Sequence, residues 1–160
     1  MWSPDGARLA YPDAGYDAFI IEVEKPWRDR PSRRLPQMGE PHARFMVRSW
    51  SPDGEKLAGE RRGDDGSPAG IMIYSFESGR FERVTDFGWY PQWLGDGRRL
   101  LFHSQGKIYL VDSRSRKVHE VLSIVPQEVA PYRFALSRDS RWIYFGVTAT
   151  EADIWLMSME

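Results

Sequence analysis

One short turn motif recurs along this chain at nearly regular intervals. The string Trp-Ser-Pro-Asp-Gly occupies positions 2–6 and returns unchanged at 50–54. It becomes Trp-Leu-Gly-Asp-Gly at 93–97 and Leu-Ser-Arg-Asp-Ser at 136–140. A side-chain acceptor, a proline that fixes φ, an aspartate and a closing glycine are the residues that a type I turn favours in that order. The sequence therefore predicts four equivalent turns, marked by Asp5-Gly6, Asp53-Gly54, Asp96-Gly97 and Asp139.

The spacing of these turns constrains the fold more than any single motif does. Successive turn aspartates are 48, 43 and 43 residues apart. A period of about 40 to 45 residues is typical of four-stranded propeller blades. We therefore expect each repeat to form one small antiparallel sheet and the sheets to pack side by side around an axis.

Each repeat shows the same order of apolar segments. A strand precedes the turn, another follows it, and a third comes after a variable polar loop. A fourth, alternating segment forms the outer edge in the second and third repeats. The predicted inner strands are 42–50, 89–93 and 132–136, and those after the turn are 9–11, 57–58, 100–102 and 142–145. The third strands are 19–23, 71–75, 108–112 and 154–158, and the outer strands are 81–85 and 117–122.

With strands named A to D from the inside out, the chain reads B-C-D, A-B-C-D, A-B-C-D and A-B-C. We thus expect an all-β, partial β-propeller of about four blades over residues 1–160, with repeats at about 1–41, 42–87, 88–130 and 131–160. The first and last blades are expected to be incomplete. We expect the chain to be the C-terminal part of a longer propeller, whose open edges could also pair with a second copy.

Composition narrows the classes of function. The chain has 22 Lys and Arg against 23 Asp and Glu, so its formal charge of -1 does not favour nucleic acid as a partner. No cysteine is present, which excludes thiol nucleophiles and thiolate metal sites. No apolar run is long enough to span a membrane, and the N-terminus has no pattern of a secretion signal.

The repeat resembles the WD40-like PD40 repeats of TolB-type bacterial propellers. The resemblance depends on Trp-Ser-Pro-Asp-Gly-x-x-Leu-Ala in the first two repeats and on Ile-Tyr-Leu-Val-Asp at 108–112 in the third. The third repeat departs from it at Leu94-Gly95, and the fourth keeps only Ser137 and Asp139 of the turn. The resemblance implies a rigid binding or sensing platform without chemistry of its own, commonly outside the cytoplasm.

Other features resemble propellers that are attached to enzymes. The ending Thr-Glu-Ala-Asp-Ile-Trp-Leu-Met at 150–157 looks like the close of propellers that follow bacterial serine/threonine kinases. Similar repeats occur in prolyl-oligopeptidase-like hydrolases. The chain could thus be the accessory propeller of an enzyme whose catalytic domain lies elsewhere.

Catalytic motifs are absent from the sequence itself. The segment 66–70, Gly-Ser-Pro-Ala-Gly, misplaces the serine of a nucleophile elbow. A triad of His103, Ser104 and Asp112 is disfavoured because neighbouring strand residues point to opposite faces. We therefore expect no catalytic residue.

Metal and cofactor sites are not expected either. His42, His103 and His119 are scattered without paired ligand spacing and are best explained as ordinary surface or strand histidines. The segment 62–66, Arg-Gly-Asp-Asp-Gly, lacks the alternating carboxylates of a calcium loop, so a solvated hairpin tip explains it better than a cation or receptor site. No phosphate-binding glycine loop occurs.

One segment combines basic and aromatic residues and is a candidate contact for a partner. Lys25 to Arg34 contains Trp27, Arg28, Arg30, Arg33 and Arg34. Tryptophan and arginine are the usual anchors of protein interfaces, so this segment could hold an acidic peptide. The alternative is that it is only the longer loop of the first repeat.

The four turn aspartates could in principle ring a funnel. Each lies inside a turn, where its carboxylate can accept hydrogen bonds from nearby backbone N–H groups, so a structural role is the better interpretation. Taken together, the sequence predicts a non-catalytic module that binds a protein or peptide partner or senses a ligand.

Overall fold

The computed structural model describes residues 1–24, 26, 28, 31–39, 42–63, 65–137 and 139–148, with backbone alone at 131–133. Within them the chain forms antiparallel sheets of three, four, four and two strands. The first sheet contains β1 (Arg8–Pro12), β2 (Ala18–Glu22) and β3 (Ser32–Arg34). The second contains β4 (Arg44–Trp50), β5 (Lys56–Arg62), β6 (Pro68–Ser75) and β7 (Arg80–Arg83). The third contains β8 (Trp89–Trp93), β9 (Arg99–Ser104), β10 (Lys107–Asp112) and β11 (Val118–Ser123), and the fourth β12 (Glu128–Leu136) and β13 (Ile143–Thr148).

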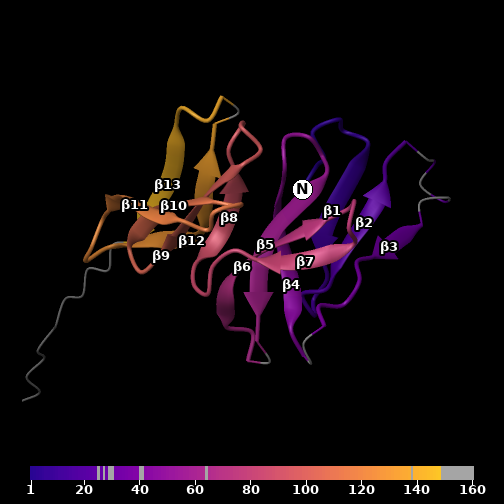
Figure 1. Ribbon diagram of the computed structural model, residues 1–160, viewed down its shortest axis with the longest axis horizontal. Helices are drawn as coiled ribbons and strands as arrows, with labels where there is room; N and C mark the ends of the chain where they lie inside the picture. The colour runs from indigo at the N-terminus through magenta and orange to yellow at the C-terminus, as the bar shows by residue number, and fades with distance from the viewer. Residues whose placement is uncertain are drawn as a thin grey trace, which may run out of the picture.

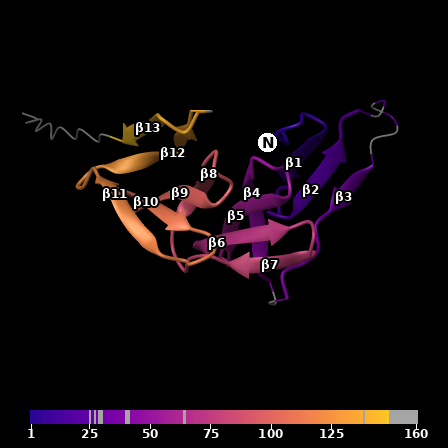
Figure 2. The ribbon, with the colours of Figure 1, turned by 45° about the horizontal axis from the view of Figure 1, so that its top comes forward.

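The four sheets follow one another side by side, as Figure 1 shows. Turned by 45°, they lie along an arc (Figure 2). The strands nearest the centre of the arc are neighbours: β1 packs against β4, β4 against β8, and β8 against β12. The predicted all-β, partial propeller is confirmed, because each sheet is open and contains consecutive strands of the chain.

The predicted strands agree with the observed ones to within a few residues. The strand order B-C-D, A-B-C-D, A-B-C-D holds for the first three sheets, and strands A and B of the fourth sheet are β12 and β13. The expected third strand of the last repeat, 154–158, lies outside the described residues. Within the described part of the chain, no helix has the length and apolar character to cross a membrane.

Three apolar cores hold neighbouring sheets together. Ala10, Ile20, Val47, Trp50 and Leu57 belong to the core between the first and second sheets. The next core joins the second and third sheets through Ala58, Ile71, Ile73, Trp93, Leu100 and Phe102. The last joins the third and fourth through Tyr90, Leu101, Ile108, Val129 and Phe134. Both faces of the middle sheets are therefore buried, and burial of apolar area is the main stabilising contribution.

The aromatic residue just before the repeat turn packs between sheets where a neighbouring sheet covers it. Trp50 and Trp93 are each only 7% exposed, whereas Trp2, in the sheet at one end of the row, is 60% exposed. Trp50 stacks on Phe76 with ring centroids 5.4 Å apart. Its indole N–H donates to the carbonyl of Met1 at 3.0 Å, which links the first two sheets.

Candidate functional site

The repeat turns are held by the same hydrogen bonds in the first, second and fourth repeats. In the first, the Ser3 hydroxyl donates to the Asp5 carboxylate at 2.5 Å and accepts from the Arg8 N–H at 2.9 Å. The Asp5 carboxylate also accepts from the Ala7 N–H at 3.0 Å. Equivalent bonds join Ser51, Asp53, Glu55 and Lys56 in the second repeat, and Ser137, Asp139, Arg141 and Trp142 in the fourth.

The third turn has no serine, and its aspartate accepts the hydrogen bond that the serine accepts in the other turns. Leu94 stands at the serine position, and the Asp96 carboxylate accepts from both the Arg98 and the Arg99 N–H at 2.9 Å. Asp96 thus satisfies the N–H group that a serine hydroxyl satisfies in the other repeats. The turn survives the substitution because one carboxylate oxygen can accept two donors.

These hydrogen bonds favour ionised carboxylates. The Ser3 hydroxyl and then the Ala7 N–H lower the pKa of Asp5, and the Ser137 hydroxyl and then the Arg141 N–H lower the pKa of Asp139. Stability from such groups is present above the pKa of the unfolded chain and is lost as pH falls through the folded value. Each of these carboxylates thus stabilises the backbone of its own turn by accepting N–H hydrogen bonds.

The four turns converge on one hollow. A cavity of about 650 Å³ is lined by residues from every repeat turn. We call it the axial hollow; its lining includes Pro4, Pro52, Gly95, Ser137 and Ser140 from the turns, and Gln92, Trp93 and Leu136 from β8 and β12.

Trp93, one of the residues that line the axial hollow, carries a buried donor without a hydrogen-bond partner in the described residues. The indole Nε1 of Trp93 makes no hydrogen bond within the described part of the chain, although the atom is buried. The equivalent indole N–H of Trp50 is satisfied by the carbonyl of Met1. A buried unpaired N–H costs about 1–3 kcal/mol, so the Trp93 indole lowers the stability of the third sheet by about that amount.

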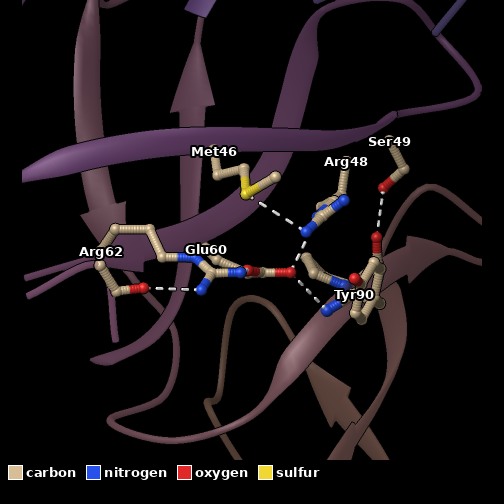
Figure 3. A network of polar contacts seen from close by, with 8 residues as sticks. Met46, Arg48, Ser49, Glu60, Arg62 and Tyr90 are labelled. Carbon is tan, nitrogen blue, oxygen red and sulfur yellow. Dashed lines mark hydrogen bonds and ion pairs between the residues drawn. The ribbon is translucent and has the colours of Figure 1, made fainter. Parts of the chain in front are cut away.

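A second polar feature lies between β5 and β8 and was not expected from the sequence. Glu60 is fully buried, and its carboxylate accepts from Arg48 Nε at 2.8 Å and from the Tyr90 N–H at 3.0 Å. Arg62 pairs with the other carboxylate oxygen of Glu60 (Figure 3). The Arg48 guanidinium also lies 3.9 Å from the centre of the Tyr90 ring. This network joins the second and third sheets by charge-assisted hydrogen bonds.

His103 lies beside this network and is buried. It is 7% exposed, and its ring stacks on Tyr90 with centroids 5.4 Å apart and an interplanar angle of 7°. Phe134 of β12 covers it at 5.3 Å. Burial lowers the pKa of His103 from 6.5 to about 4, so the imidazole is neutral at pH 7.

We expect the buried His103 to make the chain sensitive to mild acid. The unfolded chain takes up a proton near pH 6.5, whereas the folded chain does so only near pH 4. Stability should therefore fall as pH drops through this window, by on the order of 3 kcal/mol in total. Urea unfolding at pH 7, 6, 5 and 4 measures it.

The control for this prediction uses two histidine variants. His103→Phe keeps an aromatic ring and should flatten the pH dependence between 6.5 and 4. His119→Gln removes an exposed histidine and should leave the dependence as it is. An equal slope in wild type and His103→Phe would contradict the role assigned to His103.

The candidate triad is not assembled. His103 of β9 opposes Ile108 of β10, four residues along the strand from Asp112, which separates them by roughly 13 Å. Asp112 is committed to the next turn, where the Ser115 N–H and then the Arg114 N–H lower its pKa to about 2. Desolvation opposes this shift, and an ion pair with Arg98 adds to it. Ser104 is buried at the end of β9.

Within the described residues, no group of three His, Cys, Asp or Glu side chains could hold a metal ion. In the segment 62–66, Asp64 lies outside the described residues, and the Arg62 guanidinium donates to the Gly66 carbonyl at 2.7 Å.

The basic segment is placed only in part. Trp27 and Arg30 lie outside the described residues, whereas Arg28, Arg33 and Arg34 are exposed. Arg33 and Arg34 are in β3, at the outer edge of the first sheet, and Arg34 pairs with Asp17.

The sheet topology, the repeat turns and the shared hollow define the class: the chain is an open β-propeller of four-stranded blades, of which two are complete in the described residues. Its sequence matches no protein-family model and no curated protein.

Solved structures with the same fold support this class. A putative TolB from Agrobacterium tumefaciens aligns with a TM-score of 0.66 at 18% identity, over 93% of this chain and 57% of that one. An oligogalacturonate lyase in complex with manganese aligns with a TM-score of 0.71 at 11% identity, over 95% and 46%. The Cps50 (Swd1) β-propeller domain of Myceliophteria thermophila gives 0.59 at 12% identity, over 89% and 51%. The chain thus spans about half the length of these proteins, and the likeness is one of fold.

Proposed function

We propose that the chain is a non-catalytic binding module whose axial hollow receives a protein or peptide partner. The observation that carries the proposal is that residues from all four repeat turns line one hollow of about 650 Å³. A peptide offers a backbone carbonyl and an N–H at every residue, and the side-chain amide of Gln92 in the lining can pair with either group. The prolines Pro4 and Pro52 add apolar surface at the rim.

The likeness to binding propellers supports the same proposal. The Cps50 (Swd1) β-propeller domain and the WD40 repeats of RRP9 share this fold. Propellers present loops from every blade around their axis, so an axial hollow gives one partner contacts to all repeats.

Selection of peptides tests the proposal. A random peptide library is panned on the immobilised full chain, and the dissociation constants of the selected peptides are measured by calorimetry. Gln92→Trp places a bulky ring in the axial hollow and should weaken binding at least about tenfold, because contacts near the centre of an interface dominate affinity.

The matched control is Glu77→Gln, an exposed residue in the β6–β7 turn, which should bind like wild type. If no peptide is enriched, or if Gln92→Trp binds the selected peptides as tightly as wild type, the axial hollow is not the binding site.

The basic segment is proposed as a second contact, for acidic groups on the same partner. Arg28 and Arg33 are exposed cations close in sequence to the edge strand β3. The double variant Arg28→Glu/Arg33→Glu should weaken binding of a hexaglutamate peptide by about fivefold or more at low salt, with the difference fading at 0.5 M salt.

The control is the double variant Arg80→Glu/Arg114→Glu, which reverses two exposed arginines elsewhere. It changes the net charge by the same amount as Arg28→Glu/Arg33→Glu does. If both double variants weaken binding equally, the effect comes from the total charge and not from the basic segment.

The alternative function is that of an accessory propeller in an enzyme such as a membrane serine/threonine kinase or a prolyl-oligopeptidase-like hydrolase. Enzymes are among the proteins with this fold: the chain aligns with 13% of the tricorn protease chain and 27% of Porphyromonas gingivalis dipeptidyl peptidase 4. Reading the coding sequence on both sides of this chain tests the alternative, since a catalytic domain in the same frame would support it. Self-association through the open edges is a further proposal, which light scattering on a size-exclusion column tests.

A further inference from the structure

A separate cavity lies at the opposite end of the strands from the repeat turns. It has a volume of about 370 Å³, and we call it the loop cavity. It lies at the loop between β1 and β2 and the loop between β5 and β6, and both loops follow strands that begin at a repeat turn. Its lining consists of Gly15, Tyr16, His42, Arg44, Gly63 and Gly66. None of these residues lines the axial hollow.

Arg44 brings a guanidinium group without a partner to the loop cavity. It is the first residue of β4 and is half-buried, and its side chain makes no hydrogen bond or ion pair with any described residue. Its nitrogen atoms are open to solvent, whereas Nε of Arg62 is both unpaired and buried. A charged group that enters the loop cavity can therefore contact Arg44.

Arg44 also lies beside a second cation. It is paired with Arg62 across β4 and β5, and directly opposed side chains lie on the same face with Cβ atoms about 4.5–5.5 Å apart. Like charges in such a pair destabilise a sheet. The carboxylate of Glu60 is already shared between Arg48 and Arg62, so the guanidinium groups outnumber their counter-ion. The positive charge of Arg44 thus stays uncompensated within the described residues.

The carboxylates of the two loops are engaged elsewhere. Asp13 accepts from two N–H groups of its own turn at 2.9 and 2.8 Å. Asp65 accepts from the N–H and the hydroxyl of Ser67 at 2.9 and 2.6 Å. Asp17 pairs with Arg34. None of the three neutralises the unpartnered guanidinium, and their negative field disfavours an anion that carries more than one charge.

These charges and the size of the loop cavity select a carboxylate among the common anions. A guanidinium group is planar and binds a carboxylate through two parallel N–H···O bonds. A carboxylate carries one negative charge at pH 7, whereas a phosphate group carries about 1.5 to 2. A cavity of about 150 Å³ holds a benzene ring, so about 370 Å³ also holds the carbon chain of an organic acid.

We propose that the loop cavity binds a carboxylate group, which pairs with the guanidinium of Arg44 and places its carbon chain beside Tyr16. The carboxylate can be the side chain of an acidic residue in a peptide or a free organic acid. The site contains no residue of the axial hollow or of the basic segment, and the proposal depends on neither.

Four probes titrated into the full chain at low salt test the proposal: N-acetyl-glutamic acid α-amide, its neutral analogue N-acetyl-glutamine α-amide, propionate and inorganic phosphate. The amide signals of Gly63 and Gly66 in NMR spectra report binding. We expect the glutamate probe to bind at least about tenfold more tightly than the glutamine probe, because only the carboxylate supplies the missing charge. Binding of the glutamate probe and propionate indicates an acidic side chain, and binding of propionate alone indicates a free acid.

Removal of the charge decides whether Arg44 is responsible. Arg44→Gln should abolish the preference for the glutamate probe. It should unfold at the same urea concentration as wild type or at a higher one, because the repulsion from Arg62 is relieved. The matched control is Arg80→Gln, which removes an exposed arginine of β7 and should bind the glutamate probe like wild type.

A steric variant tests the position of the site. Gly15→Trp places a bulky ring in the loop cavity and should block the glutamate probe and propionate; a Cβ at Gly15 meets only the Asp13 carboxylate, at 3.4 Å and beyond. Ala14→Trp, at the exposed neighbouring position outside the lining, should bind like wild type. Gln92→Trp, in the axial hollow, should also leave carboxylate binding unchanged.

Three results would overturn the proposal. The first is equal binding of the glutamate and glutamine probes, and the second is tighter binding of phosphate than of propionate. The third is wild-type binding of propionate by Gly15→Trp, a result that stands even where Arg44→Gln fails to fold.

Discussion

Glu60→Gln is expected to lower the free energy of unfolding by roughly 3–5 kcal/mol. The carboxylate is fully buried and contacts two guanidinium groups and one backbone N–H. The amide keeps the shape of the side chain but removes the buried negative charge that both guanidinium groups contact. Urea unfolding of the full chain measures the change, and a loss of about 10 °C or more in melting temperature should accompany it.

The control for this variant is Glu82→Gln, which removes an exposed carboxylate from the outer strand β7. It should change stability by less than about 0.5 kcal/mol. If the two variants were equally stable, the network around Glu60 would contribute nothing beyond a surface ion pair, and the interface between the second and third sheets would depend on apolar packing alone.

Gly70→Ala is expected to cost roughly 3–4 kcal/mol through the backbone. Gly70 begins the buried part of β6 at φ 110°, a conformation that residues with a Cβ rarely adopt. A Cβ at this position would lie 2.1 Å from the carbonyl oxygen of Thr85, so the chain after β7 would have to shift. Strain and overpacking add in this variant.

The variant Gly79→Ala separates the cost of backbone strain from the cost of overpacking. Gly79 also has positive φ, 65°, but a Cβ there would meet no atom within 4 Å. Gly79→Ala should therefore cost only the conformational penalty, about 1 kcal/mol. Equal losses for Gly70→Ala and Gly79→Ala in urea unfolding would show that the close approach of Thr85 is not a constraint.

The fold could be predicted from the sequence because the residues that specify each turn are neighbours in the chain and recur in every repeat. The turn at 50–54 is specified by its own residues, and the spacing of its copies gives the number of sheets. Burial of Trp50 and Trp93 follows from the same repetition, since each lies where the preceding sheet packs.

The polar network and the cavities could not be predicted because they arise between repeats. The charged residues Glu60 and Arg62 at the end of β5 suggest, from the sequence, a strand that ends in solvent. Both are buried, however, because a four-stranded blade between two others is buried on both faces. The alternation of side chains along β5 could have indicated their burial. Glu60 and Arg62 lie on the same face of β5 as Ala58, and Ala58 belongs to the core shared with the third sheet. Two opposite charges at such positions require pairing.

His103 illustrates the same limit. A lone histidine in an apolar strand is compatible with either a surface or a buried position, and only the neighbouring sheets, through Tyr90 and Phe134, decide between them. The basic segment, by contrast, was visible in the sequence, and its role in binding stays a prediction.

The most direct test of the central claim, that successive repeats bring their turns together around one hollow, is a NOESY spectrum of the full chain. A Cβ position on Gly54 lies 3.8 Å from Cδ of Pro4, and one on Gly97 lies 3.9 Å from Cδ of Pro52, across 50 and 45 residues of sequence. We therefore predict cross-peaks from the δ protons of each proline to the α protons of its partner glycine. Folded chain that shows strong contacts within each turn and neither of these cross-peaks would contradict the stacking of the repeats.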